Sequence, residues 1–271
     1  MDPALSTIFL RLGYKDCIYD HYCATPNVSF VGGGPLPASQ GSYSLAFTPT
    51  EGSTATTATA TVSGIPHPQI AVRADTSGHY ATGGDVVGDA YARLDYYFMI
   101  FSPGTATVPI AFSVTETVGG QAPAVSSTGQ PFDSFAYACA YIAYLDSRCV
   151  FADPADAGSG GTYAFTLDYS INSNTPYLID LTASVESFDG LAFASIDSTL
   201  SVPEAYPYPY FLILSPGIEN RVPEPNSLAL IAIGSIGLIV VYRHPAWAAR
   251  ATHLRSVMQW RKPIMEVAGH K

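Results

Sequence analysis

The stretch that decides the fold is AYARLDYYFMIF at Ala90–Phe101, followed by SPG at residues 102–104 and by VPIAFSVTETV at Val108–Val118. The first run is rich in aromatic and aliphatic side chains, which pack well on a pleated sheet. In the second run apolar side chains alternate with small or polar ones, as one face of a half-buried strand requires. Ser-Pro-Gly is a strong turn signal, so the stretch predicts a strand-turn-strand unit with the geometry of a β-hairpin.

Further strands are expected on both sides of this unit. Alternating patterns or small β-favouring residues predict strands over residues 42–47, 54–62, 162–169, 177–188 and 191–200. The interval from Phe132 to Val150 is apolar without a decisive period, so a strand and a short helix both remain open there. Short strands separated by turns at fairly regular spacing predict a mainly β fold, an antiparallel β-sandwich of jelly-roll-like form.

Composition separates the chain into two parts of opposite charge. Residues 1–242 hold six Lys/Arg against 21 Asp/Glu, a formal charge of −15, whereas residues 243–271 hold six Lys/Arg and one Glu, a formal charge of +5. The acidic part repels nucleic acid phosphates, so no nucleic acid partner is predicted. The basic part follows an apolar run, where a positive-inside signal would lie, so the two parts suit opposite sides of a membrane.

The four cysteines fall in two close pairs, Cys17 with Cys23 and Cys139 with Cys149. An even count with local pairing fits two disulfides in an oxidising compartment, although four cysteines allow three connectivities and buried thiols are the alternative. Zinc sites need closer cysteine spacing and histidine partners. No metal site and no cofactor are predicted.

The predicted organisation has five segments. Residues 1–40 form an irregular N-terminal segment and residues 41–200 the β-sandwich outer domain. Repeated prolines predict an extended spacer over residues 201–221, with a final edge strand at Tyr210–Leu214 as the alternative. The opening residues lack a basic start and a long apolar run, so an exported chain is expected to begin further upstream.

A short motif and an apolar run mark residues 222–243. Pro223, Glu224 and Pro225 precede the run Leu228–Tyr242, and Arg243 follows it. As a helix, 15 to 17 residues would span about 22–26 Å, somewhat less than the hydrocarbon core of about 30 Å. A buried core helix is the alternative, but internal glycines and the basic flank favour one C-terminal transmembrane helix. Its apolar side chains include Leu228, Ile231, Ile236, Leu238 and Val241.

The order Pro-Glu-Pro, short apolar helix, arginine resembles the PEP-CTERM sorting signal, which is also known as the ice-binding protein C-terminal domain. The resemblance covers residues 222–243. It implies a Gram-negative bacterium in which an exosortase recognises Pro223, Glu224 and Pro225 and cleaves near them, while Arg243 acts as the stop-transfer flank. Such signals usually end soon after the basic flank, so residues 244–271 are either a basic cytoplasmic tail or an artefact of the gene model.

The resemblance implies an exported protein that is first anchored in the inner membrane with its outer domain outside, and is later at the cell surface or extracellular. The sequence contains none of the metalloprotease, nucleophile-elbow or phosphate-loop motifs, so the expected function is a non-enzymatic surface or matrix protein associated with exopolysaccharide and biofilm. The alternative is a carbohydrate- or ice-binding module, with exposed tyrosines stacking on sugars. Asp85 and Asp89 are weak calcium candidates, and a solvated acidic turn is the simpler interpretation.

Overall fold

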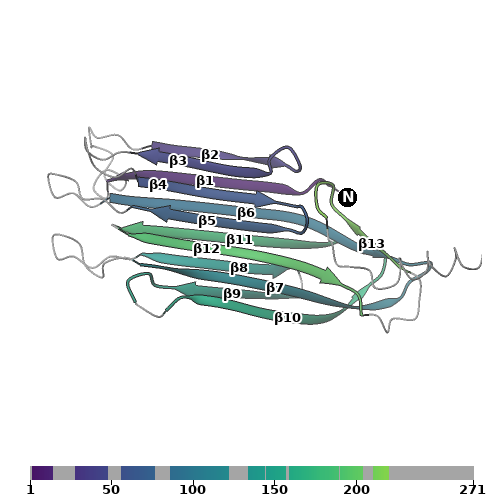
Figure 1. The fold of residues 1–271 in the computed structure, drawn as a ribbon. Coiled ribbons are helices and arrows are strands. Elements are labelled where there is room, and N and C mark those ends of the chain that lie inside the picture. The colour runs from purple at the N-terminus through teal and green to yellow at the C-terminus, as the bar shows by residue number, and fades with distance from the viewer. Residues whose placement is uncertain are drawn as a thin grey trace, which may run out of the picture. The chain divides into compact units, whose positions relative to one another are not determined.

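The predicted mainly β fold with two antiparallel sheets is confirmed by the computed structural model (Figure 1). Thirteen strands and no helix are present in the part of the chain that the structure describes. These described residues are 2–14, 28–47, 56–76, 86–121, 134–143, 145–156, 159–188, 190–203 and 210–219. The chain divides into two compact units, Met1–Val222 and Pro223–Lys271, and everything below on structure concerns the first.

Sheet A has the strand order β2-β1-β6-β11-β8-β9, with β13 also paired to β6, and sheet B has the order β10-β7-β12-β5-β4-β3. The strands of sheet A are β1 (Leu5–Tyr14), β2 (Val28–Pro35), β6 (Val86–Phe101), β8 (Phe135–Ile142), β9 (Asp146–Ala152), β11 (Tyr177–Phe188) and β13 (Phe211–Leu214). The strands of sheet B are β3 (Gly41–Phe47), β4 (Thr56–Ser63), β5 (Gln69–Asp75), β7 (Thr107–Gln121), β10 (Gly161–Asn172) and β12 (Leu191–Ser201).

The eight strands from β5 to β12 are paired in a nested way. β5 pairs with β12, β6 with β11, β7 with β10 and β8 with β9, and all four pairs are antiparallel. The pair β8–β11 then joins β6, β11, β8 and β9 into four consecutive strands of sheet A. The pair β7–β12 likewise joins β10, β7, β12 and β5 into four consecutive strands of sheet B. This is the strand order of a jelly roll, which the strands β1 to β4 widen on one side.

The predicted hairpin between Ala90–Phe101 and Val108–Val118 is wrong. Both segments are strands, but β6 lies in sheet A and β7 in sheet B, so the turn at residues 102–104 connects the two layers. Both strands turn fully buried side chains inward, and Phe98 on β6 and Phe112 on β7 are the largest of them. β6 lies over β4 and β5 of sheet B, and β7 lies over β8 and β9 of sheet A, so each strand buries its inward side chains against the opposite sheet.

The expected irregular segment 1–40 is corrected in the same way. β1 and β2 pair with each other, and β1 also pairs along β6, because Ile8, Leu10 and Leu12 all point into the core. The glycines of β2 obscured this strand in the sequence. The undecided interval 132–150 holds strand β8 and most of strand β9, which form a hairpin.

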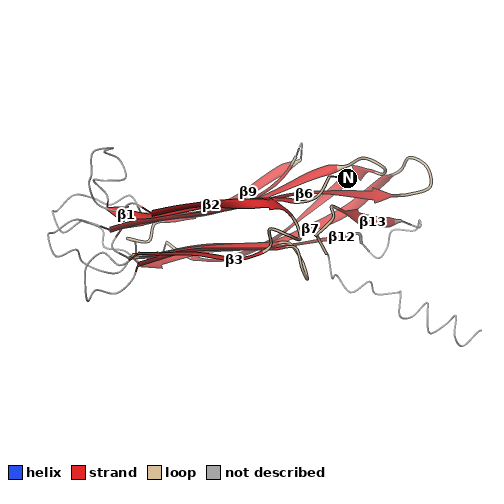
Figure 2. Cartoon of the chain, turned by 90° about the horizontal axis from the view of Figure 1, so that it is seen from above, coloured by secondary structure: helices blue, strands red, loops and turns tan. Residues whose placement is uncertain are grey.

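The core between the sheets changes in side-chain size along β6. Ala90 and Ala92 lie near its beginning, whereas Phe98 and Ile100 lie near its end, and all four are fully buried. Figure 2 shows the sheets edge-on as two layers that diverge toward the end of β6. Small side chains allow two sheets to approach closely, and large ones hold them apart, so the graded core accounts for the divergence.

The predicted spacer at residues 201–221 is corrected in part, because the alternative of a final edge strand is the one the structure contains. β13 pairs with the end of β6, and the chain then continues across the end of the sandwich. The Ser215 amide donates to the Tyr97 carbonyl at 2.9 Å, and the Glu219 amide donates to the Gly64 carbonyl at 2.7 Å. We call residues 210–219 the C-terminal strap, because these bonds connect it to both sheets.

Candidate functional site

Partly exposed aromatic side chains form a row across the outer face of sheet A. Strand alternation turns every second residue of this sheet outward. The register then places side chains from five neighbouring strands in one line, which crosses four strand spacings, or about 19 Å. This aromatic row consists of Phe9, Tyr91, Tyr137 and Phe151, with Ser184 on β11 between the two tyrosines.

A charged pair lies one step along the strands from the aromatic row. Arg11 on β1 forms a salt bridge with its register partner Asp89 on β6. Burial raises the pKa of the Asp89 carboxyl, and the guanidinium of Arg11 opposes that shift. The second oxygen, Asp89 Oδ1, is buried and has no hydrogen-bond partner among the described residues. The accessible part of the pair is mainly the Arg11 side chain, which is 28% exposed against 13% for Asp89, so Arg11 is the group that a ligand could reach.

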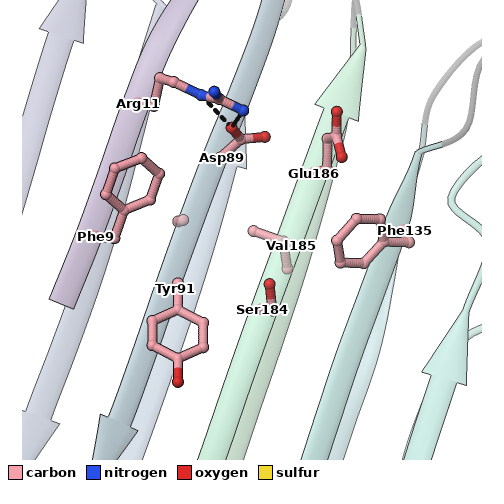
Figure 3. Close-up of a pocket in the computed structure, with 9 residues that line it drawn as sticks. Phe9, Arg11, Asp89, Tyr91, Phe135, Ser184, Val185 and Glu186 are labelled. Atoms are coloured by element: carbon pink, nitrogen blue, oxygen red, sulfur yellow. Dashed lines mark hydrogen bonds and ion pairs between the residues drawn. The ribbon is translucent and has the colours of Figure 1, made fainter. Parts of the chain in front are cut away.

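A shallow hollow lies between the aromatic row and this pair. Its volume is about 400 Å³. Figure 3 shows the rings of Phe9, Tyr91 and Phe135 around it, with Arg11 and Asp89 joined at one end. The residues that line it are Phe9, Arg11, Asp89, Ala90, Tyr91, Phe135, Ser184, Val185 and Glu186. Rings and carboxylates thus border the same space.

A second charged cluster lies on the other side of the aromatic row. Arg93 on β6 donates to Asp95 at 3.0 Å and contacts Asp180 on β11 at 2.8 Å. Burial and the neighbouring Asp180 raise the pKa of the Asp95 carboxyl, which Arg93 lowers. Arg93 therefore pairs with both Asp95 and Asp180, which lie opposite each other on the neighbouring strands β6 and β11.

Glu116 is a carboxyl group inside the sandwich. It lies on β7 and is fully buried, and neither of its oxygens has a hydrogen-bond partner in the described part of the chain. Burial raises the pKa of Glu116 to about 8, and the nearby backbone of Ala140 opposes the shift only in part. Sequence reasoning missed this residue, although the break that Glu116 makes in the buried positions between Val114 and Val118 was visible.

Cys139 and Cys149 are joined by a disulfide on the outer face of sheet A. They are register partners on β8 and β9, with Cα atoms 4.0 Å apart. The Tyr137 hydroxyl lies 3.3 Å from the sulfur of Cys149, so the bridge borders the aromatic row. Cys17 and Cys23 lie outside the residues that the structure describes.

Replacing both Cys139 and Cys149 by alanine is expected to lower the free energy of unfolding by about 2–3 kcal/mol. The bridge closes a loop of 10 residues, and such a loop restricts the unfolded chain by that amount. Urea denaturation of the parent and the double variant measures the difference. It should disappear when both proteins are measured with a reductant; a difference that persists would mean that packing, not the cross-link, is responsible.

The predicted sorting residues lie beyond the strap, outside the described residues. These are Pro223, Glu224, Pro225, the apolar side chains of 228–242 and Arg243. In the portion that is described, no helix has the length and apolar character to cross a membrane. The same portion contains no group of three His, Cys, Asp or Glu side chains placed to hold a metal ion. Of the two calcium candidates, Asp89 pairs with Arg11 and Asp85 is not described.

Comparison with known proteins identifies one segment of the chain. No curated protein matches the sequence. Residues 221–243 match the family described as the PEP-CTERM protein-sorting motif, in agreement with the resemblance drawn from the Pro-Glu-Pro sequence. This motif indicates a protein that an exosortase sorts to the cell surface. The chain therefore contains a β-sandwich and, after it, a PEP-CTERM sorting segment at residues 221–243.

Proposed function

We propose that this chain is a non-catalytic surface or extracellular matrix protein of a Gram-negative bacterium. The observation that carries the proposal is the sorting motif at residues 221–243, in which Pro-Glu-Pro, an apolar run and an arginine follow in order. The run Leu228–Tyr242 crosses the inner membrane as a helix, and Arg243 stops its transfer. Cleavage near Pro223–Pro225 then releases the sandwich from this anchor.

Two features of the sandwich support a location outside the cytoplasm. The disulfide between Cys139 and Cys149 belongs in an oxidising compartment. Residues 1–242 carry a formal charge of −15, which keeps the outer part away from anionic lipid, while the basic residues 243–271 remain on the cytoplasmic side. Charge and cysteine chemistry thus agree with the direction of transfer that the sorting motif requires.

The proposal assigns no catalysis to the sandwich. The carboxylates of Asp89, Asp95 and Asp180 on the outer face are each held by an arginine, an arrangement that suits fixed recognition better than proton transfer. In this proposal the outer face of sheet A serves recognition, and the exosortase is the enzyme that acts on the chain.

Expression of the chain, joined to an export signal, in hosts with and without an exosortase tests the sorting proposal. The expected result is a shortened product only with the exosortase, with its new C-terminus near Pro223–Pro225 by mass spectrometry. Replacing Pro223, Glu224 and Pro225 by alanine should leave the precursor uncut in the membrane fraction. An unshortened, water-soluble product in both hosts would show that Leu228–Tyr242 is a core helix and would overturn the proposal.

A further inference from the structure

The outer face of sheet A has the chemistry of a site for a hydroxyl-rich ligand. A pyranose ring has an apolar face of C–H groups and a rim of hydroxyl groups, so its recognition needs flat rings beside polar acceptors and donors. The electron-rich face of an aromatic ring attracts polarised C–H groups. Phe9, Tyr91 and Phe135 provide such rings around the hollow, and Arg11 with Asp89 provides the polar end (Figure 3).

We propose that this face binds a neutral polysaccharide, with one sugar ring in the hollow and the chain lying along the aromatic row. The row continues beyond the hollow through Tyr137 to Phe151, whose side chain is 61% exposed. Tyr91 and Tyr137 are separated by two strand spacings, about 10 Å, which is comparable to the length of a disaccharide. Phe135 and Phe151 stand with their ring centroids 6.5 Å apart and extend the same apolar surface.

The polar groups around the hollow are already fixed in position. Arg11 is held by Asp89 and lies with its guanidinium carbon 5.9 Å from the centroid of the Phe9 ring. The Arg11 side chain remains 28% accessible, so its guanidinium can donate to a sugar hydroxyl at this end of the hollow. Groups held in place before binding lose less entropy when a ligand arrives.

Charge selects a neutral polymer over an acidic one. Among the described residues of this face, Arg11 and Arg93 pair with the carboxylates of Asp89, Asp95 and Asp180, and Glu186 adds a fourth carboxylate. The surrounding sandwich is strongly acidic as well, so uronic acid polymers and nucleic acids are repelled. Sugar hydroxyls, by contrast, donate readily to carboxylates.

The outer face of sheet B differs and provides the internal control. Its outward positions are mainly threonine, serine and alanine, for example Thr117, Ser195 and Thr61. Phe193 is one aromatic residue on that face, and it is half-buried like Tyr91. A Phe193→Ala variant therefore removes a ring of similar exposure from the opposite side of the same sandwich.

Affinity electrophoresis of the full chain in mild detergent tests the site. The gels contain hydroxyethyl cellulose, xylan or galactomannan as neutral polymers and alginate as the acidic one. We expect retardation by at least one neutral polymer and none by alginate. Tyr91→Ala and Phe135→Ala should each weaken that binding about tenfold, the order of magnitude of one lost ring contact, whereas Phe193→Ala should not change it.

Three outcomes would overturn the proposal: migration unaffected by every neutral polymer, retardation by alginate alone, or equal weakening by Phe193→Ala and Tyr91→Ala. Melting curves of each variant identify any loss that comes from unfolding, and Asp89→Asn, which keeps the shape of the side chain, tests the polar end separately. These measurements do not involve residues 221–243. A failure here is therefore distinguishable from a failure of the sorting proposal.

Discussion

Replacing Glu116 by glutamine is expected to stabilise the protein by on the order of 3–5 kcal/mol above pH 8. The carboxyl is fully buried without a hydrogen-bond partner among the described residues, and its pKa in the folded state is about 8 against an ordinary value of 4.5. One pKa unit corresponds to about 1.4 kcal/mol of differential stability. Glutamine keeps the size and shape of the side chain but never ionises.

The sign of the effect follows from where the proton is held. Below pH 4.5 both folded and unfolded chains keep Glu116 protonated, and the carboxyl imposes no pH-dependent cost. Between pH 4.5 and about 8 the unfolded chain loses the proton while the folded chain retains it, so stability falls as the pH rises. Above the folded pKa both states are ionised, and the loss reaches its full size.

Urea denaturation from pH 4 to pH 9 measures this difference. The parent should lose stability relative to Glu116→Gln across the range, and the two should converge near pH 4. Asp168→Asn, which changes an exposed carboxyl on β10, is the control and should show no comparable divergence. Parallel pH profiles for the parent and Glu116→Gln would contradict the buried, protonated state of this carboxyl.

Replacing Phe98 by alanine is expected to lower the free energy of unfolding by about 3–5 kcal/mol. The ring is fully buried between the sheets and stacks on Tyr177 with centroids 5.5 Å apart. Its removal leaves a cavity at the end of the core where the layers diverge and where little can move in to fill it. Because domains of this kind are only marginally stable, the variant should also reach the cell surface in smaller amounts.

Phe211→Ala is the matched control for this experiment. The same ring is removed from β13, the strand that pairs with the end of β6, but there its side chain is 65% exposed. Thermal or urea unfolding should show a change well below 1 kcal/mol for this variant. Similar losses in the free energy of unfolding for Phe98→Ala and Phe211→Ala would contradict the claim that Phe98 is a main contributor to the core.

The sequence predicted the β class because its strands carry a period-two pattern that needs no tertiary information. β11 is the clearest case, since Ile179, Leu181, Ala183 and Val185 are all buried and the intervening residues are not. The partner of each strand was not predictable in this way. A turn signal such as Ser102-Pro103-Gly104 states where the chain reverses, but not whether it returns in the same sheet or in the other.

The residues of the aromatic row could not be predicted either, because they too depend on which strands are neighbours. Phe9, Tyr91 and Phe151 are far apart in the chain, and only the registers of β1, β6, β11, β8 and β9 place them in one row. The sorting motif could be recognised because it is local: its residues are contiguous, and their order alone carries the signal. The expectation that exposed tyrosines stack on sugars could name no face of the sandwich and stays a prediction.

The C-terminal strap determines how the sandwich would respond to mechanical force. Before cleavage, a pull on the sorting segment first reaches the bond between the Glu219 amide and the Gly64 carbonyl, and then the four residues of β13. From Glu219 to Pro223 the chain can extend by at most about 14 Å, so little slack precedes that load. Tension from a cell envelope that swells or flows would therefore detach the strap before it strained the nested strands β5 to β12. While the strap gave way, the sheet A face would keep its shape.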